Sequence, residues 1–228
     1  MHHLLYLLAL VPPLFELLEH RGPPAEPHAW VPGAAGGLLA LVLVHLLVRA
    51  RSHLAAQAVI DPLTGLFSRR RFDQDLPTEV TRAERQGLPL TVATVDVDRF
   101  RAINERFGHQ EGEQVLVRLG KALQRLVRGG VDTCYRIGWD EFCVLMPGAS
   151  EKEANIIIER IWHAAHGEEV GLDRLGGGLS IGLAAFQKGE GPAPLLRRAE
   201  QIMFETKQKA KRQEKPRTPG EDPESSRG

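Results

Sequence analysis

The chain has 228 residues, of which 43% are hydrophobic and 25% are charged, a composition that allows one well-packed domain and some additional segments. Lysine plus arginine and aspartate plus glutamate both number 29, so the formal net charge is zero. This balance provides no broad basic face of the kind that binds a nucleic acid polymer. Any nucleotide bound by this chain is therefore expected to be a small ligand.

The first sixty residues are more apolar than the rest of the chain. Residues 29–48 carry no formal charge, and as a helix they are long enough to cross roughly 30 Å of hydrocarbon. Arg49 and Arg51 follow directly, and the positive-inside rule then places everything after them in the cytoplasm. We therefore predict a transmembrane helix at 29–48 that anchors the chain in the inner (cytoplasmic) membrane.

Further segments are predicted on both sides of this helix. Residues 1–28 are apolar but broken by prolines, which fits either a short second membrane span or the end of a longer membrane region. Residues 49–60 are rich in helix formers and predict a helical stalk. Residues 213–228 are rich in Pro, Gly, Ser and charge and predict a disordered tail. The folded cytoplasmic domain is therefore expected at 59–212.

Within that domain, the hydrophobic periodicity predicts helices that alternate with strands. The expected elements are a helix at 68–86, a strand at 90–96, a helix at 110–127, strands at 132–137 and 140–146, a helix at 150–166, a strand at 178–184 and a helix at 193–211. Alternating strands and helices indicate an α/β fold or α+β sandwich. The βαββαβ order indicates a ferredoxin-like palm, with a central, mostly antiparallel sheet covered by helices.

Acidic side chains stand at the ends of two predicted strands. Asp96 and Asp98 follow the apolar run at 90–95, and Asp140 and Glu141 lie in the turn of the predicted hairpin. Strands that bring carboxylates to one place predict a hard-cation site for a phosphate substrate.

Four sequence motifs accompany these acids in a fixed order. They are Asp-Pro-Leu-Thr-Gly-Leu at 61–66, Asp-Val-Asp-Arg-Phe-Arg-Ala-Ile-Asn at 96–104, Gly-Trp-Asp-Glu-Phe at 138–142, and Ser-Ile-Gly at 180–182 with a later Lys207. Together they resemble the GGDEF domains, the diguanylate cyclases that condense two GTP into cyclic di-GMP. The resemblance implies a role in cyclic di-GMP signalling, with GTP as substrate, Mg²⁺ or Mn²⁺ as cofactor, and a homodimer if the chain is active. Other protein partners are compatible with it.

The resemblance also implies roles for residues at the matching positions. The metal positions are Asp96, Asp140 and Glu141, and the catalytic positions are Glu141, Asp140 and Arg101. The substrate-binding positions are Asn104, Glu113, His109, Gly138, Lys207 and Lys211. Asp132 is what remains of the family's product-inhibition motif, because Gly129 stands where that motif has an arginine.

Trp139 is the main departure from the family, which has a second glycine at this turn position. A two-residue hairpin turn favours glycine because its central residues adopt positive φ, so a bulky residue costs on the order of 1 kcal/mol. An indole is also expected to occupy the space of the ribose and the α-phosphate. Glu113, where the family has Asp, is expected to loosen guanine recognition. We predict weakened or absent cyclase activity; the alternative is a non-catalytic GTP-binding or protein-interaction module.

The chain contains two cysteines, Cys134 and Cys143. With a turn centred on Gly138 and Trp139, they are expected opposite each other across the hairpin, at a pair where side chains approach closely. Two reduced core thiols and a redox-sensitive bridge are both compatible with this position, and a cytoplasmic location favours the thiols.

Overall fold

The computed structural model describes residues 41–46, 49 and 58–214 of a chain that divides into two units, 1–56 and 57–228. The described residues of the first unit are helical, and their apolar side chains are exposed. The predicted segment 1–28, most of the span and stalk, and the tail beyond 214 lie outside the described residues. No helix in the described parts of the chain is both long and apolar enough to cross a membrane.

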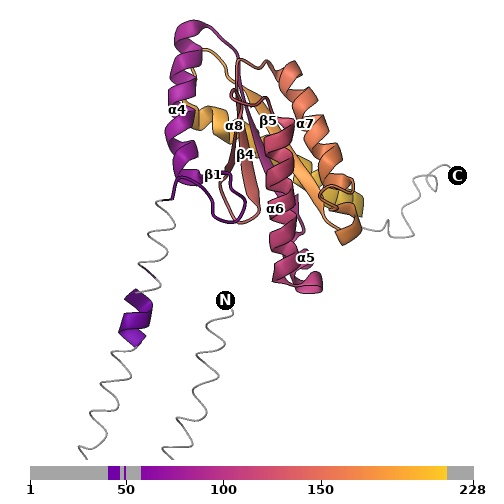
Figure 1. Ribbon diagram of the computed structural model, residues 1–228. Helices are drawn as coiled ribbons and strands as arrows, with labels where there is room; N and C mark the ends of the chain where they lie inside the picture. The colour runs from indigo at the N-terminus through magenta and orange to yellow at the C-terminus, as the bar shows by residue number, and fades with distance from the viewer. Residues whose placement is uncertain (1–40, 47–48, 50–57, 215–228) are drawn as a thin grey trace, which may run out of the picture. The chain divides into compact units, whose positions relative to one another are not determined.

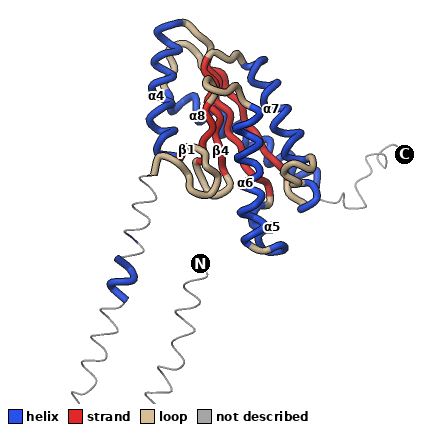
Figure 2. Tube along the Cα trace, viewed as in Figure 1, coloured by secondary structure: helices blue, strands red, loops and turns tan. Residues whose placement is uncertain are grey.

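The second unit contains a five-stranded sheet with helices on both faces (Figures 1 and 2). The strands are β1 (Phe67–Ser68), β2 (Leu90–Asp98), β3 (Thr133–Arg136), β4 (Glu141–Pro147) and β5 (Gly178–Ala185). The helices are α4 (Arg69–Gln86), α5 (Phe100–Phe107), α6 (His109–Leu126), α7 (Glu151–His166), the 3-10 helix η1 (Asp173–Leu175) and α8 (Pro192–Glu214).

The sheet has the strand order β1-β3-β4-β2-β5. The central strand β2 is antiparallel to both β4 and β5, β3 is antiparallel to β4, and β1 is parallel to β3. Apart from β1, the order of strands and helices is that of a βαββαβ palm. The structure therefore confirms the predicted mixed α/β fold with a mostly antiparallel sheet.

Alternation along β2 divides the core into two layers. Val95 and Val97 face α5, α6 and α7, whereas Leu90 and Val92 face α4 and α8. Helix α6 contributes most to the first layer through residues at helical spacing: Val115, Leu116, Leu119, Leu123 and Leu126. The sheet is thus covered by helices on both faces (Figure 2).

The structure contains short elements that the periodicity did not predict. Helix α5 occupies a segment for which the periodicity predicts no element. Arg99, at φ 58°, turns the chain from β2 directly into α5. Gly108, at φ 86°, then separates α5 from α6. A helix of 8 residues is shorter than the window in which helical periodicity can be recognised. Strand β1 is defined only by its pairing with β3, which is a tertiary contact.

The predicted pairing of the two cysteines is wrong by one residue. Cys134 pairs with Val144, and Cys143 pairs with Tyr135, because residues 137–141 form an odd-numbered loop between the last paired positions. A shift of one residue turns a side chain to the other face of a sheet. The thiols therefore lie in different core layers and cannot form the proposed bridge with each other. Burial raises the pKa of both, that of Cys134 to about 12, so both remain protonated.

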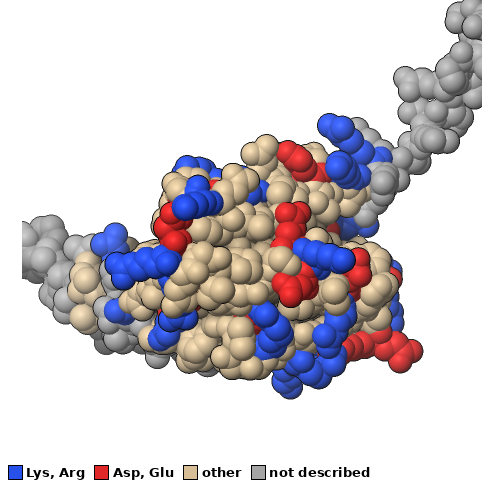
Figure 3. Space-filling model, turned by 90° about the horizontal axis from the view of Figure 1, so that it is seen from above, with Lys and Arg blue, Asp and Glu red and all other residues tan. Residues whose placement is uncertain are grey.

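Charged side chains of both signs are interspersed on the end of the domain seen in Figure 3. Helix α4 carries charges of both signs, which form ion pairs at i,i+4 spacing between Arg69 and Asp73 and between Arg71 and Asp75. Pairs of this kind are solvated and contribute little to stability. The charges that matter for a ligand are those at the acidic end of β2 and β4.

Gly182 allows α8 to lie directly against β5. A Cβ atom at this position would be 2.0 Å from the carbonyl oxygen of Ala199 and 2.3 Å from the backbone nitrogen of Met203. Both are backbone atoms of α8, which cannot move aside as a side chain can. The absence of a side chain at Gly182 therefore fixes how closely α8 approaches the sheet.

We predict that Gly182→Ala destabilises the domain by about 2 kcal/mol or more, because the added methyl group pushes α8 off the sheet. Chemical denaturation followed by circular dichroism measures this change. Gly129→Ala is the matched control, since a Cβ there meets no atom within 4 Å and Gly129 has no positive φ. Equal stabilities of the two variants would contradict the packing argument.

Candidate active site

The acidic residues meet where β2 ends and β4 begins. Asp96 and Glu141 are directly paired in the antiparallel register, so their side chains lie on the same face of the sheet. The backbone N–H of Val97 donates to the carbonyl oxygen of Asp140 at 3.1 Å, which holds the turn against β2. The structure thus brings together the three acids predicted as metal positions.

Lys207 of α8 supplies the positive charge beside these acids. Its Nζ donates to Oδ1 of Asp96 at 2.5 Å, and the Asp96 side chain is only 7% exposed. Burial by itself lowers the pKa of Lys207, but the hydrogen bond and the negative charges of Asp96, Asp98 and Asp140 outweigh it and raise the pKa. Lys207 is therefore protonated and neutralises part of the acidic charge.

The two acids of the turn are harder to ionise than isolated carboxylates. Burial raises the pKa of Asp140, and the negative charge of Asp96 raises it further. Burial also raises the pKa of Glu141, with additional contributions from Asp96, Asp140 and Glu200. The positive charge of Lys207 opposes both shifts. The three acids outnumber Lys207, so the site keeps an excess of negative charge, as is expected of a site that binds a cation.

The turn itself differs from the expected two-residue hairpin. Neither Gly138 nor Trp139 has a positive φ, so the predicted backbone strain at Trp139 is wrong. The longer loop explains this, because its central residues need not adopt the mirror-image turn conformation. Gly138 is needed for space instead, since a Cβ there would lie 2.7 Å from Oε2 of Glu141.

Arg136 forms a hydrogen bond to the turn and connects the turn to residues 61–66. Its Nη2 donates to the carbonyl oxygen of Trp139 at 2.7 Å, and its Nη1 donates to Oδ1 of Asp61 at 3.1 Å. The same Asp61 oxygen accepts the backbone N–H and the hydroxyl of Thr64. Burial tends to raise the pKa of Asp61, but these hydrogen bonds outweigh it and lower the pKa. The sequence showed the two motifs but not this bridge between them.

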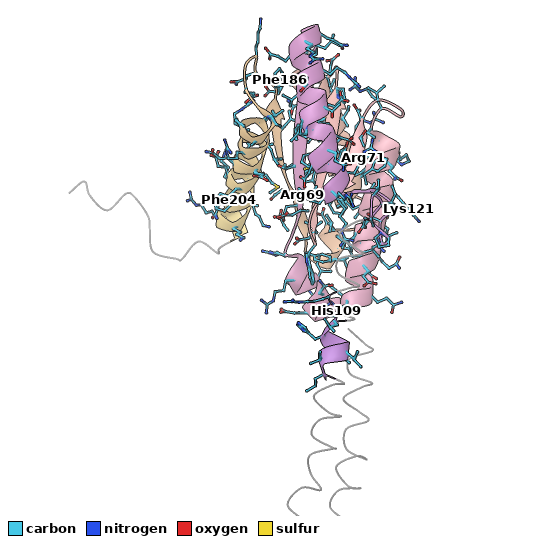
Figure 4. The ribbon with its side chains drawn as sticks, turned by 90° about the vertical axis from the view of Figure 1, so that its left-hand side faces the viewer. Arg69, Arg71, His109, Lys121, Phe186 and Phe204 are labelled. Carbon is cyan, nitrogen blue, oxygen red and sulfur yellow. The ribbon has the colours of Figure 1, made fainter. Side chains whose placement is uncertain are left out.

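A pocket of about 440 Å³ opens beside the turn. Its lining residues are Phe100, Arg101, Asn104, Glu105, His109, Trp139 and Asp140. Asn104 packs over Gly112, where a Cβ would lie 2.0 Å from its Oδ1, so the glycine makes room for the amide. Figure 4 shows His109 at the end of the domain where α6 begins. Asn104, His109 and Asp140 therefore line one cavity.

Other predicted residues lie away from the pocket or have other partners. Arg101 lines it, but its side chain is 92% exposed and is paired with Glu105 at 2.8 Å. Glu113 and Lys211 are exposed and do not line the pocket. The residues that line the pocket therefore include neither Glu113, the predicted guanine-binding acid, nor Lys211.

Asp132, predicted as a remnant of an inhibitory site, accepts hydrogen bonds through both of its carboxylate oxygens. Arg128 forms a two-pronged ion pair with it, with Nη2 at 2.6 Å from Oδ1 and Nε at 3.0 Å from Oδ2. The Asp132 carboxylate also accepts the backbone N–H of Arg128 at 2.8 Å. Its side chain is buried, so in this structure Asp132 closes the loop after α6.

A second pocket, of about 270 Å³, lies between the sheet and α8. It is lined by Thr94, Val95, Ile137, Glu141, Phe142, Glu200, Met203 and Phe204. Figure 4 shows Phe204 on α8. No sequence pattern predicts this pocket, because only the folded chain brings α8 next to the turn.

The donor set fits a magnesium ion. No group of three His, Cys, Asp or Glu side chains within the described parts of the chain is placed so that it could hold a metal ion. Mg²⁺ nevertheless needs only one or two carboxylates, because water and substrate phosphates supply its other ligands. Asp96 and Asp140, which the pairing of β2 with β4 and the hydrogen bond from Val97 bring together, can provide those two.

A palm fold with carboxylates at two adjacent strand ends and a nucleoside-sized pocket beside them is typical of nucleotide-binding palm domains. The family model "Diguanylate cyclase, GGDEF domain" matches residues 58–213. The chain therefore belongs to the GGDEF domain family.

Individual relatives agree with this assignment. The response regulator PleD of Caulobacter vibrioides is 36% identical over 68% of this chain and 35% of its own length. The uncharacterised protein YhcK of Bacillus subtilis is 33% identical over 78% of this chain and 52% of its own length. The GGDEF domain of DgcB from Caulobacter crescentus, solved with c-di-GMP, is 25% identical, with a TM-score of 0.61 over 68% of this chain and 90% of that chain. The chain spans about half or less of the curated relatives it matches.

We predict that Lys207→Met increases the affinity for Mg²⁺ in the absence of nucleotide by about tenfold, because the acids lose their only neutralising lysine in the described site. Calorimetric titration with Mg²⁺ measures the change. Lys211→Met is the matched control, one turn further along α8 and exposed. Unchanged Mg²⁺ affinity in Lys207→Met would show that the ion pair does not compete with a metal.

Proposed function

We propose that this chain is a membrane-anchored GGDEF protein of cyclic di-GMP signalling that binds GTP with Mg²⁺ or Mn²⁺ and has weakened or no cyclase turnover. The observation that carries the proposal is the pairing of Asp96 with Glu141 at the strand ends, next to Asp140 and Lys207. It supports a phosphate site beside the pocket that contains Asn104.

The residues of this site have distinct roles in the proposal. Asn104 hydrogen-bonds to the edge of the base, and Asp96 and Asp140 would hold Mg²⁺. The ion, when bound, neutralises charge on the phosphates. Lys207 exchanges its hydrogen bond with Asp96 for one with a phosphate oxygen. Glu141, with its raised pKa, is suited to accept the proton of the attacking 3′-hydroxyl.

Reduced turnover in this proposal follows from side-chain bulk at the turn. Trp139 adopts an unstrained backbone, so its effect on catalysis is confined to the space that its ring occupies at the rim of the pocket. Condensation requires the 3′-hydroxyl of one GTP to reach the α-phosphorus of another, and a misplacement of about 1 Å reduces such a reaction by roughly a hundredfold. Trp139 therefore interferes with the approach of the second nucleotide more than with binding of the first.

A non-catalytic regulatory module is the second candidate. It is favoured by the outward position of Glu113 and the exposed, paired state of Arg101, two residues that an active site would employ. In that case the domain binds GTP, or a protein partner, and signals through its conformation. Where the module binds GTP, it uses the same nucleotide site as the first candidate and differs from it only in that no product is formed.

Turnover separates the two candidates. We expect little or no cyclic di-GMP from the purified full chain with GTP and Mg²⁺, and at least a tenfold increase in Trp139→Gly, because the second nucleotide can then approach. Asp96→Asn in the Trp139→Gly background is the control that should abolish product. Product from the parent chain at an undiminished rate would show that the indole swings clear. The absence of both product and GTP binding would contradict the proposal as a whole.

Membrane anchoring is proposed from the uncharged stretch at 29–48 and the arginines that follow it. The exposed leucines of the described helical residues 41–46 agree with a segment that has an apolar environment. Dimerisation through this segment would bring two GTP-loaded domains together. We expect the full chain in the membrane pellet after a carbonate wash and residues 58–214 alone in the supernatant. Release of the full chain by the wash would contradict the anchor.

A further inference from the structure

The indole of Trp139 has an unusual environment. Its side chain is 86% exposed, more than that of any other large apolar residue in the described parts of the chain, and yet it lines a pocket. No aromatic or cation–π contact to the ring is found among residues 58–214. So much apolar surface in water is unfavourable, and a flat ligand placed against the ring would cover it.

The backbone on both sides of Trp139 is firmly held. Arg136 donates to the carbonyl oxygen of Trp139, Val97 donates to that of Asp140, and the N–H of Gly138 donates to that of Glu141 at 3.2 Å. The Cα of Trp139 is therefore fixed relative to the strand ends, and only the ring can turn. Because the backbone is fixed and the indole can rotate, the ring can adjust its orientation to a ligand at the rim of the pocket.

The other walls complete a site for a flat heterocycle. Phe100 supplies a second aromatic ring and Asn104 a planar amide, and both lie against Gly112, where a Cβ would be 2.0 Å from Oδ1 of Asn104 and 3.3 Å from Cζ of Phe100. The cavity of about 440 Å³ falls within the range of small-ligand pockets, roughly 300–1,000 Å³. An amide edge beside aromatic rings matches the edge and faces of a nucleobase.

The acids near this pocket do not contribute to recognition of the base, which therefore depends on stacking and on the amide of Asn104. Glu113 is exposed and outside the lining, Glu105 is paired with Arg101, and Asp140 belongs to the acidic end of the sheet. Neither of the two carboxylates that line the pocket, Glu105 and Asp140, is therefore available to the donor edge that distinguishes guanine from adenine. Stacking on an aromatic ring favours neither, because every base has a π-face.

We propose that Trp139 stacks on the purine base of the bound nucleotide, so that the residue in place of the family glycine is a positioning residue that contributes affinity and leaves guanine only weakly preferred over adenine. This inference rests on the proposed nucleotide binding at the same pocket. It assigns to the indole a favourable contact with the first nucleotide, in addition to its obstruction of the second.

The test compares substitutions that separate stacking from bulk. Calorimetry with the full chain and Mg²⁺ measures the affinities of GTP, ATP and tripolyphosphate for the parent, Trp139→Phe, Trp139→Leu and Trp139→Gly. We expect Trp139→Phe within about threefold of the parent and the Leu and Gly variants weakened by about tenfold or more for both nucleotides. Tripolyphosphate, which has no base, should bind all four alike. Trp162→Phe, on α7, is the matched control and should change nothing.

Each contrary result identifies what has failed. GTP binding by Trp139→Gly as tight as by the parent would overturn the stacking role and leave the proposed function intact. Equal affinity in the Phe and Leu variants would show a contact that needs bulk alone, and a preference for GTP over ATP of about a hundredfold would overturn the weak discrimination. A parent chain that binds no nucleotide would contradict the proposed function and the stacking contact together.

Discussion

Repulsion among three carboxylates at one end of the sheet is the constraint around which the site is arranged. The pKa values of Asp140 and Glu141 are raised by burial and by neighbouring negative charge. A carboxyl group with a higher pKa in the folded state binds protons more readily folded than unfolded, so its ionisation destabilises the fold as the pH rises through that pKa. At neutral pH the domain therefore carries charges that oppose its own stability, and Lys207 offsets part of their effect.

Contacts far from the acids keep them in place. The bare backbone of Gly182 lets α8 lie close enough for Lys207 to reach Asp96, and Arg136 connects the turn to Asp61 near the start of the domain. Gly182 and Arg136 thus keep the turn and its neighbouring acids in place, although neither residue takes part in the proposed reaction. Against this rigid background a single exposed side chain, Trp139, can favour the bound nucleotide and still hinder the reaction, because binding and turnover depend on different geometries.

The sequence predicted the long elements correctly and the short ones poorly. Periodicity is visible in α6 because its apolar residues repeat over 18 positions, whereas α5 is too short and β1 exists only through its partner strand. The family motifs led to Asn104 and to the acids of the turn, which the structure brings around one end of the sheet. The hairpin register, the unstrained Trp139, the Arg136 bridge and the pocket under α8 all depend on tertiary contacts that no local pattern records.

The odd number of residues in the loop at 137–141 has a consequence for how this turn can vary. A slip of β4 by one residue against β2 would turn Glu141 to the other face of the sheet, into the core that faces α6. A change in the turn that keeps this register, such as the replacement of a side chain, leaves Glu141 opposite Asp96. A tryptophan at residue 139 is a variation of this kind, since it alters what projects from the loop and leaves the pairing of the strands as it was.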